Sequence, residues 1–330
     1  MTYTRGWDTS QVGFGPEARD LITRALVPPR PGPARQTPAD TAPAPDPAVM
    51  VRTGTYVVDP PFFGNGDIGG LAVCGAVNEL AAAGAEPRHL ALGIVLEAGL
   101  PLGLVHRLTA SVRAAAAEAG VAVAAVDTRV VRAGEADRVF LTATAFGERG
   151  GHPLGLDTVR PGDSIVVTGS LGSHAAHLVS LRDGLGYEHH VPSDCAPLAG
   201  LLRTVRADLR HARPVVDGGL AEVLRLCAAG RGLTLRVDED ALPVRYEARV
   251  ALATRGLAPL DAACAGCLCL FVPPERVRTV LAALRAHPYG RNAALVGEVT
   301  ADPLGDVEFV TREGVRPRTP SAGPLPERLL

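Results

Sequence analysis

The run Thr53–Pro87 constrains the fold of this chain more than any other segment, because it reads as a strand, a glycine-rich loop and a helix of small residues. A loop that leads from a strand into a helix presents backbone amides and the positive end of the helix. Asp67 lies at this point of the run. The order therefore predicts an α/β unit with a site suited to a phosphate and its magnesium ion.

The size and composition of the chain predict two ordinary domains and argue against two classes of partner. Its 330 residues are 47% hydrophobic, which suits two cores better than a single oversized one. A formal net charge of −2 and a pI near 6.5 provide no electrostatic footprint for nucleic acid or for an anionic membrane surface. We therefore expect neither partner.

The sequence pattern also lacks targeting and disulfide signals. No apolar run is long enough for a membrane span, and Met1–Asp8 lacks the basic-then-apolar order of a signal peptide. The six cysteines are scattered, which favours core or site residues over a disulfide framework. Together these features predict a cytoplasmic protein.

Composition divides the chain into four segments. Residues 1–48 hold one short helix-like stretch, Glu17–Leu26, and an arm at 28–47 with eight prolines, which we expect to be extended and mobile. A globular pattern follows, and the turn at Val159–Asp163 marks the start of a second domain. We predict one domain at 49–158, a second domain at 159–318 and a polar tail at 319–330.

Apolar runs and helical periodicity predict the secondary structure of both domains. The expected strands are Tyr56–Val58, Leu90–Leu96, Val121–Val126, Val139–Phe146, Ser164–Thr168, Leu233–Val237, Cys267–Val272 and Ala294–Val299. The expected helices are Ile68–Gly84, Leu104–Ala119, Ala175–Leu185, Gly219–Ala229 and Glu275–Ala286. This mixture of strands and helices predicts the α/β (α+β) class.

A series of ordered motifs carries a resemblance to a known family. Beyond the opening run the motifs are Leu90–Glu97, Val126–Val131, Val167–Gly172, Ser193–Ala196, Ala241–Val244, Leu281–Gly290 and Ala294–Val299. On these motifs the sequence from about Thr53 to Thr311 resembles the hydrogenase maturation factor HypE, a carbamoyl dehydratase of the aminoimidazole-ribotide synthetase (PurM-like) superfamily. The resemblance implies two domains, an N-terminal sheet that dimerises into a barrel, a C-terminal α/β domain, and ATP in the cleft between them.

The resemblance also implies a chemistry. In the family, a carbamoyl group on a C-terminal cysteine is phosphorylated by ATP and dehydrated to a thiocyanate, which becomes the cyanide ligand of a nickel–iron centre. This reaction needs a thiolate carrier, carboxylates that hold magnesium and cations on the phosphoryl group. Where the family ends Pro-Arg-Ile-Cys, this sequence ends Leu329-Leu330. We therefore expect no carbamoylation at that end.

Several positions of the expected cleft also differ from the family. Gly54 and Ala265 stand where the family motifs Thr-Asp-Ser-Tyr and Asn-Glu-Gly-Lys have carboxylates. Gly70 and Cys267 stand at family lysines, and Asp217 replaces a positive side chain. Two unit charges about 4 Å apart interact by roughly 4 kcal/mol at an effective dielectric of 20, so a charge reversal beside a phosphate is costly. We therefore expect ATP and Mg²⁺ to bind weakly or not at all.

The residues retained from the family's cleft form the candidate site. The resemblance gives catalytic roles to Asp67, Asp127 and His174. It assigns to the inherited nucleotide cleft Asn78, Thr128, Arg129, Gly169 and Gly172. The retained acids can still form one magnesium site, since magnesium often takes only one or two protein carboxylates. In the alternative interpretation, the two acids cap loops or helices and Asn78 is a packed polar residue.

The segment Cys264–Cys269 is a second candidate. In one interpretation it enters a buried strand, where Cys267 and Cys269 share a face as small hydrophobes. In another, Cys264 or Cys267 is a reactive thiol with a catalytic role, in place of the family's asparagine and lysine. We expect no metal site, because no matching histidine or second cysteine pair lies nearby in the sequence.

Three functions remain open at this point. The first is a HypE-like protein that has lost carbamoyl dehydration and acts by binding, as a homodimer or with an intact HypE-like relative or a pathway enzyme. The second is a repurposed enzyme of specialised metabolism that uses the inherited cleft for another small molecule. The third is ordinary HypE activity in nickel–iron hydrogenase maturation. We expect a homodimer in each case, because the N-terminal strands keep the apolar pattern that the family's barrel requires.

Overall fold

The computed structural model describes residues 48–301, 306–311, 314–317 and 328–330. All of them belong to one compact unit, which begins at residue 43. The helix expected at 17–26, the arm expected at 28–47 and most of the tail at 319–330 lie outside the described residues. Among the helices that the structure describes, none has the length and apolar character needed to cross a membrane.

Four strands form the first sheet, in the order β1–β6–β4–β5. Their bounds are β1 (Val49–Tyr56), β4 (Ala85–Glu97), β5 (Ala122–Val131) and β6 (Val139–Arg149). β6 pairs antiparallel with β1 and β4, whereas β4 and β5 are parallel. Every second residue of β6 from Val139 to Gly147 is buried, as expected for a sheet with one covered face. β5 is an edge strand, and all its residues except Val131 are exposed.

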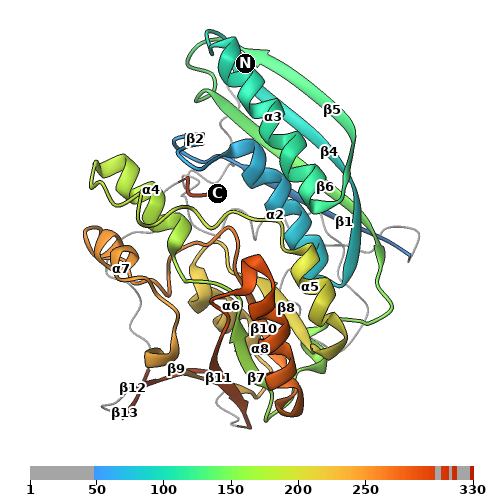
Figure 1. Cartoon of the computed structure of the whole chain (residues 1–330), viewed down its shortest axis with the longest axis vertical. Coiled ribbons are helices and arrows are strands. Elements are labelled where there is room, and N and C mark those ends of the chain that lie inside the picture. The colour runs from blue at the N-terminus through green and yellow to red at the C-terminus, as the bar shows by residue number, and fades with distance from the viewer. Residues whose placement is uncertain (1–47, 302–305, 312–313, 318–327) are drawn as a thin grey trace, which may run out of the picture. The chain divides into compact units, whose positions relative to one another are not determined.

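Two helices pack on this sheet, α2 (Ile68–Ala82) and α3 (Leu102–Ala119). α2 contacts β1, β4 and β6, and α3 lies along α2 (Figure 1). The two helices approach closely at Gly69, where an added Cβ would lie 2.8 Å from Cδ1 of Leu108. The small residues of α2 therefore allow α3 to pack against it. A short hairpin of β2 (Phe62–Phe63) and β3 (Gly66–Asp67) leads into α2.

Seven strands form the second sheet, in the order β13–β12–β9–β11–β7–β10–β8. Their bounds are β7 (Ser164–Val167), β8 (His211–Pro214), β9 (Thr234–Asp238), β10 (Leu268–Val272), β11 (Ala294–Thr300), β12 (Val307–Thr311) and β13 (Gly314–Pro317). Leu268 and Leu270 of β10 belong to one apolar cluster, whereas Cys269 and Phe271 belong to another. This alternation shows that β10 is buried on both faces of the sheet.

Helices and short 3₁₀ turns accompany the second sheet. The helices are α4 (Ser173–Asp183), α5 (Ala199–Val205), α6 (Gly219–Ala228), α7 (Tyr246–Ala253) and α8 (Val277–Ala286). The 3₁₀ turns are η1 (Leu156–Thr158), η2 (Arg206–Asp208), η3 (Glu239–Ala241), η4 (Pro274–Arg276) and η5 (Pro288–Gly290). α4 packs on α7, and α5 packs on α8. The α/β (α+β) class predicted from the sequence is confirmed.

Two predicted elements need correction. The strand predicted at Tyr56–Val58 is wrong, because β1 ends at Tyr56 and the next residues pair with residues 328–330 instead. The helix predicted from Glu275 begins later, since η4 precedes it and α8 starts at Val277. The sequence also did not predict α5, α7, β8, β12 or β13, most of which are too short to show a clear periodicity.

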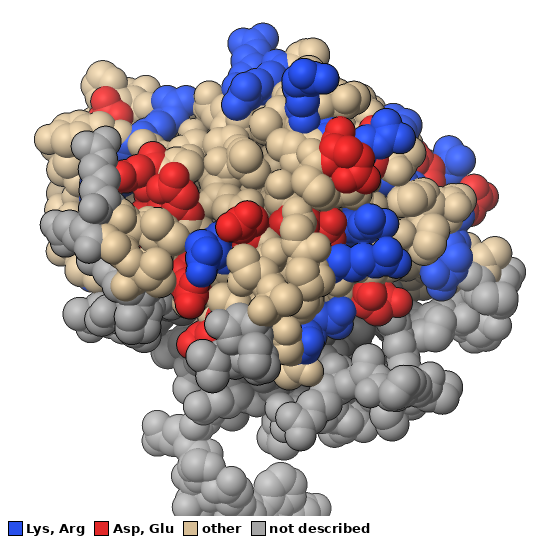
Figure 2. All heavy atoms as spheres, turned by 90° about the horizontal axis from the view of Figure 1, so that it is seen from below, with Lys and Arg blue, Asp and Glu red and all other residues tan. Residues whose placement is uncertain are grey.

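One face of the molecule carries charges of both signs. Figure 2 shows acidic and basic side chains interspersed on the face seen from below Figure 1. Acidic and basic side chains also form ion pairs, for example Arg203 with Glu86 at 2.6 Å. Such interspersed charges produce no extended field of one sign on the face shown.

Candidate functional site

Asp67 caps the helix that follows the glycine-rich loop. Its Oδ1 accepts hydrogen bonds from the amides of Gly69 at 2.9 Å and Gly70 at 3.1 Å, and its Oδ2 lies 3.9 Å from Nε of Arg107. The side chain is buried. The amides that would bind a phosphate at the start of α2 therefore already bind the chain's own carboxylate. This contact supports the capping interpretation of Asp67.

Asn78 lies deeper in α2 and ties the helix to the C-terminal half of the chain. Its Nδ2 donates to the carbonyl of Ala196 at 2.9 Å, and its Oδ1 accepts from the amide of Leu198 at 2.6 Å. Asn78 is only 3% exposed. One amide side chain thus satisfies two backbone groups, as the packed-polar interpretation requires.

A buried phenol occupies the space next to Gly54, where the resemblance places a carboxylate. A Cβ added to Gly54 would lie 2.8 Å from the hydroxyl of Tyr56, and one added to Gly75 would lie 2.3 Å from it. Burial raises the pKa of Tyr56 well above its usual range, so the phenol is neutral. A carboxylate at position 54 would have to displace this ring from its place between β1 and α2.

Asp127, Thr128 and Arg129 lie on the edge strand β5. Asp127 and Arg129 form an ion pair at 2.9 Å, and both side chains are at least 70% exposed. The two acids therefore have different partners: Asp67 binds the amides at the start of α2, and Asp127 binds Arg129. Among the described residues no group of three or more His, Cys, Asp or Glu side chains lies together as a metal site would require. Asp67 and Asp127 therefore belong to no such group in the described chain.

His174 is the centre of a buried polar network. Its Nε2 lies 2.7 Å from the carbonyl oxygen of Leu329, and its Nδ1 lies 2.7 Å from Oγ of Ser193. Because a carbonyl only accepts, Nε2 carries the proton, and Nδ1 accepts from the Ser193 hydroxyl. The side chain of Asn65 holds the backbone of Ser193 on both sides, at 2.9 Å to its carbonyl and 3.1 Å to its amide. His174 is thus a neutral donor that binds a backbone carbonyl.

Residues 328–330 lie in a slot between the two halves of the chain, with Arg328 in the left-handed region at a φ of 54°. The amide of Val57 donates to the carbonyl of Leu330 at 3.0 Å, and the amide of Asp59 donates to that of Arg328 at 3.0 Å. This is an antiparallel pairing. Arg182 on α4 donates to the carbonyls of Asp59 and Arg328, each at 2.7 Å. We call the segment 57–59 together with His174 and Arg182 the peptide slot.

Apolar burial and a further ion pair complete the contacts of this segment. Leu329 is 7% exposed and belongs to the larger apolar cluster. The guanidinium of Arg328 donates to the carbonyl of Val57 at 3.0 Å and pairs with Asp137. Backbone hydrogen bonds, a buried leucine and a paired arginine are the contacts by which an extended peptide is recognised at a strand edge.

The second predicted group of residues meets at the glycine loop before α4. The amide of Gly172 donates to Sγ of Cys264 at 3.2 Å, and Sγ of Cys267 lies 3.6 Å from the carbonyl of Gly169. A hydrogen bond with Cys267, followed by burial, raises the pKa of Cys264 well above its usual range. Cys264 is therefore a thiol at neutral pH rather than the thiolate that a nucleophile requires.

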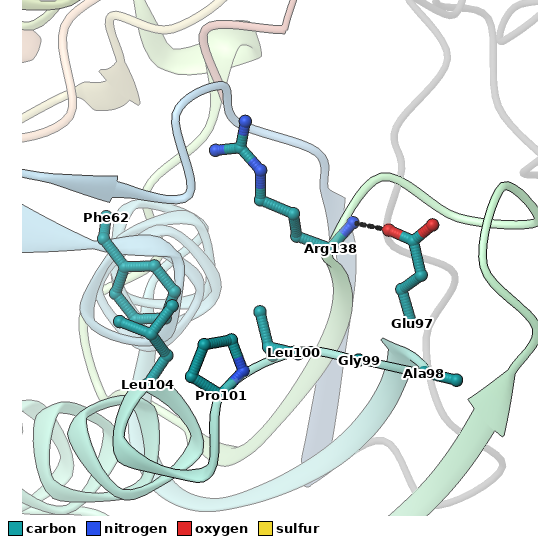
Figure 3. A pocket seen from close by; sticks show the side chains of 8 residues that line it. All are labelled: Phe62, Glu97, Ala98, Gly99, Leu100, Pro101, Leu104 and Arg138. Atoms are coloured by element: carbon teal, nitrogen blue, oxygen red, sulfur yellow. Dashed lines mark hydrogen bonds between the residues drawn. The ribbon is translucent and has the colours of Figure 1, made fainter.

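A pocket of about 550 Å³ opens where β4 meets α3 (Figure 3). Its lining is Phe62, Glu97, Ala98, Gly99, Leu100, Pro101, Leu104 and Arg138. The carboxylate of Glu97 accepts from the amides of Gly134 at 2.5 Å and Arg138 at 2.8 Å. These bonds lower the pKa of Glu97 and hold Arg138 at a φ of 65°. The pocket combines apolar walls with one guanidinium and one carboxylate, and the carboxylate is bound to backbone amides.

The structure thus brings the predicted residues together in three separate places. His174 lies in the peptide slot, Cys264 and Cys267 lie against Gly169 and Gly172, and the residues of β5 stand apart on the sheet edge. Asp67 and Asn78 make structural contacts. The sequence did not single out Arg182. Arg182 lies eight residues after His174, a spacing that places both side chains on one face of a helix. This spacing is visible in the sequence and could have identified Arg182.

Acid should destabilise the protein through His174, and a glutamine at this position should reduce the effect. Burial lowers the pKa of His174 to about 4, below its ordinary value of 6.5. Between pH 6.5 and about 4, His174 is therefore protonated in the unfolded chain but not in the folded chain. The free energy of unfolding falls over this range, and the loss approaches roughly 3 kcal/mol at pH 4.

His174→Gln keeps a donor for the Leu329 carbonyl but does not titrate. Its free energy of unfolding, measured by urea titration at half-unit steps from pH 7 to 4, should fall less steeply than that of the wild type. His211, whose pKa burial lowers to about 3, contributes equally to both proteins. Parallel curves for the two proteins would contradict the prediction.

Comparison with known proteins agrees with these features. The N-terminal domain of AIR synthase related proteins matches residues 39–149, and their C-terminal domain matches residues 160–310. Carbamoyl dehydratase HypE of Azotobacter vinelandii is 43% identical over 271 residues, which are 81% of this chain and 79% of that protein.

Two solved structures are similar throughout. A HypE in a HypE–HypF complex has a TM-score of 0.84 at 29% identity, covering 93% of this chain and 100% of that one. A HypE in complex with ATP has a TM-score of 0.80 at 37% identity, covering 86% of this chain and 87% of that one. The order of motifs, the fold and these identities lead to one conclusion: the chain belongs to the HypE family of AIR synthase related, PurM-like proteins.

Proposed function

We propose that this HypE-family chain acts by binding, as an accessory dimer in hydrogenase maturation, and that it has lost the family's ATP-dependent carbamoyl dehydration. The observation that carries the proposal is the hydrogen bond of 2.7 Å between Nε2 of His174 and the carbonyl of Leu329. It makes the retained histidine a neutral donor that recognises a peptide. A histidine that donates its proton to a carbonyl is not a free general base.

The surroundings of the expected nucleotide support the same proposal. The amides at the start of α2 bind Asp67. The phenol of Tyr56 fills the space beside Gly54. Asp127 is paired with Arg129. Phosphoryl transfer depends on positioned metal ions and cations, and in each of these three contacts a group near the expected nucleotide is bound to another part of this chain.

ATP with magnesium should bind with a dissociation constant above about 10 μM, which corresponds to roughly 7 kcal/mol. Isothermal titration calorimetry of the full chain with MgATP measures this directly. The HypE that was crystallised with ATP is the positive control in the same buffer. A dissociation constant below about 10 μM would overturn the proposed loss of dehydration, because the site would then still hold its nucleotide.

The proposed dimer uses the first sheet. β5 pairs with β4 on one side only, and its other edge is free among the described strands. Val126 and Val130 on this strand are 56% and 68% exposed. An exposed edge strand with apolar side chains is a template for a second chain. A second copy would also bring its own Asp127 and Arg129 to the same interface.

A maturation partner is proposed from the relatives. One similar HypE was solved in a complex with HypF. By this likeness we propose that a HypF-type protein or an intact HypE-like relative binds the dimer. Co-purification of the full chain with each candidate, at equal concentrations, distinguishes these two partners from a homodimer alone.

A second candidate function is a repurposed enzyme or binder of a small molecule, and the pocket in Figure 3 favours it. Its volume of about 550 Å³ is in the range of small-molecule sites. Phe62 also lies under the guanidinium of Arg107 at 5.3 Å. With Arg138 at the rim, such a pocket suits an apolar body with a carboxylate or other anionic group.

A further inference from the structure

The cysteines at 264 and 267 flank a tight turn. The chain bends at Ala265 and Gly266, directly before β10 begins. Both sulfur atoms lie against the glycine loop before α4, Cys264 at Gly172 and Cys267 at Gly169. Both side chains are buried, with 0% and 3% of the residues exposed. A spacing of two residues is the one that the common dithiol motif uses to bring two sulfur atoms together.

The carboxylate of Asp194 binds the backbone of this turn through two hydrogen bonds. Its Oδ1 accepts from the amide of Ala265 at 3.0 Å, and its Oδ2 accepts from that of Gly266 at 3.2 Å. A Cβ added to Gly266 would lie 1.8 Å from the carbonyl oxygen of Asp194, so only glycine fits at this position. With both central amides bound to one carboxylate, the turn keeps both cysteines on the side of the glycine loop.

The sulfur atoms also hold the glycine loop that leads into α4. Sγ of Cys264 accepts from the amide of Gly172 at 3.2 Å and lies 3.9 Å from the carbonyl of Ser170. Sγ of Cys267 lies 3.6 Å from the carbonyl of Gly169. Carbonyls only accept, so these last two contacts need the hydrogen of a thiol. The state of the two sulfurs is thereby linked to the loop that positions His174.

We propose that Cys264 and Cys267 are an oxidisable dithiol that closes into a disulfide at the base of the glycine loop. The reaction breaks two S–H bonds and forms one S–S bond. Hydrogen peroxide is the oxidant and is reduced to two water molecules. The thiolate of Cys267 first attacks the peroxide to give a sulfenic acid and hydroxide, and the hydroxide takes up the proton that Cys267 released. The thiol of Cys264 then attacks the sulfenic sulfur, and its oxygen leaves as water with the proton of that thiol. The disulfide has no S–H donor, so it loses the contacts with the carbonyls of Gly169 and Ser170.

Two other buried thiols are the natural comparison. Cys269 shares a face of β10 with Cys267, as their spacing predicts, and Cys227 lies on α6 in the same apolar cluster. Burial raises the pKa of Cys269 well above its usual range and that of Cys227 to about 11. These two lack the turn that aligns Cys264 with Cys267, so they should remain reduced.

Mass spectrometry tests the proposal on the full chain. The reduced protein is treated with hydrogen peroxide at pH 8.5, denatured in N-ethylmaleimide and digested with trypsin. Cleavage after Arg255 and Arg276 gives one peptide that holds Cys264, Cys267 and Cys269. We expect this peptide to carry one maleimide instead of three, on Cys269, and to be two hydrogen atoms lighter at the other two cysteines.

Matched variants separate the pair from its neighbours. Cys269→Ser should still form the disulfide, whereas Cys264→Ser and Cys267→Ala should not. The reaction should be slower at pH 7 than at pH 8.5, because thiolate is the attacking species. Three maleimides on the treated wild-type peptide would overturn the proposal. A disulfide that joins Cys269 or Cys74 while Cys264 stays reduced would overturn it as well. The wild-type result stands even if a variant does not fold.

Discussion

Replacing Asn78 with leucine should lower the free energy of unfolding by about 3 kcal/mol, because two buried backbone groups lose their partner. These groups are the carbonyl of Ala196 and the amide of Leu198, which bind Asn78 at 2.9 and 2.6 Å. Leucine branches at the same carbon as asparagine, although it is larger, and it neither accepts nor donates hydrogen bonds. The measurement is equilibrium unfolding in urea at pH 7.5, followed by circular dichroism.

Asn292→Leu is the matched control. Its Nδ2 makes one exposed hydrogen bond, at 3.2 Å to Oγ of Ser170, so its loss should change the stability by no more than about 0.5 kcal/mol. A loss of less than about 1 kcal/mol for Asn78→Leu would show that water replaces the amide, and that α2 does not depend on this side chain for its link to residues 196–198.

The double substitution Val126→Glu and Val130→Glu should convert the proposed dimer into a monomer. Each glutamate would place a carboxylate on β5, where the two valines are more than half exposed in the single chain. Burial of unpaired charge in an interface costs several kcal/mol. Light scattering at micromolar concentration should give twice the chain mass of 34.2 kDa for the wild type and the single mass for the variant.

Tyr246→Glu on α7 controls for a general effect of surface charge, since Tyr246 is 75% exposed and lies outside the first sheet. It should leave the mass at twice that of the chain. A monodisperse wild-type monomer would reject the dimer. A doubly substituted protein that keeps the dimer mass would place the interface away from β5.

Much of the fold was predictable because its signals are local. The glycine loop and the small residues after Asp67 predict α2, and the apolar alternation from Val139 predicts β6. The same logic failed at Val57 and Val58, whose apolar side chains suggested a strand. There the backbone pairs with residues 328–330, a partner so distant in sequence that no local pattern reveals it.

The candidate site was less predictable than the fold, because residue type does not determine what a polar group binds. Asp67 reads equally as a metal ligand and as a helix cap, and only the amide distances decide between them. The sequence singled out His174 as a candidate residue, but its carbonyl partner could not be foreseen. The family resemblance identified which residues were retained, whereas their contacts came from packing.

The antiparallel pairing of Val57 with Leu330 also sets an order of events during synthesis. The strands of the first sheet are complete at Arg149, but the carbonyl of Leu329 follows His174, to which it binds, by 155 residues. Closing so long a loop costs chain entropy before any contact is gained. On a ribosome, both halves of the chain can therefore fold while the peptide slot is still empty. Until residues 328–330 emerge, the nascent protein offers an open slot to any extended peptide nearby.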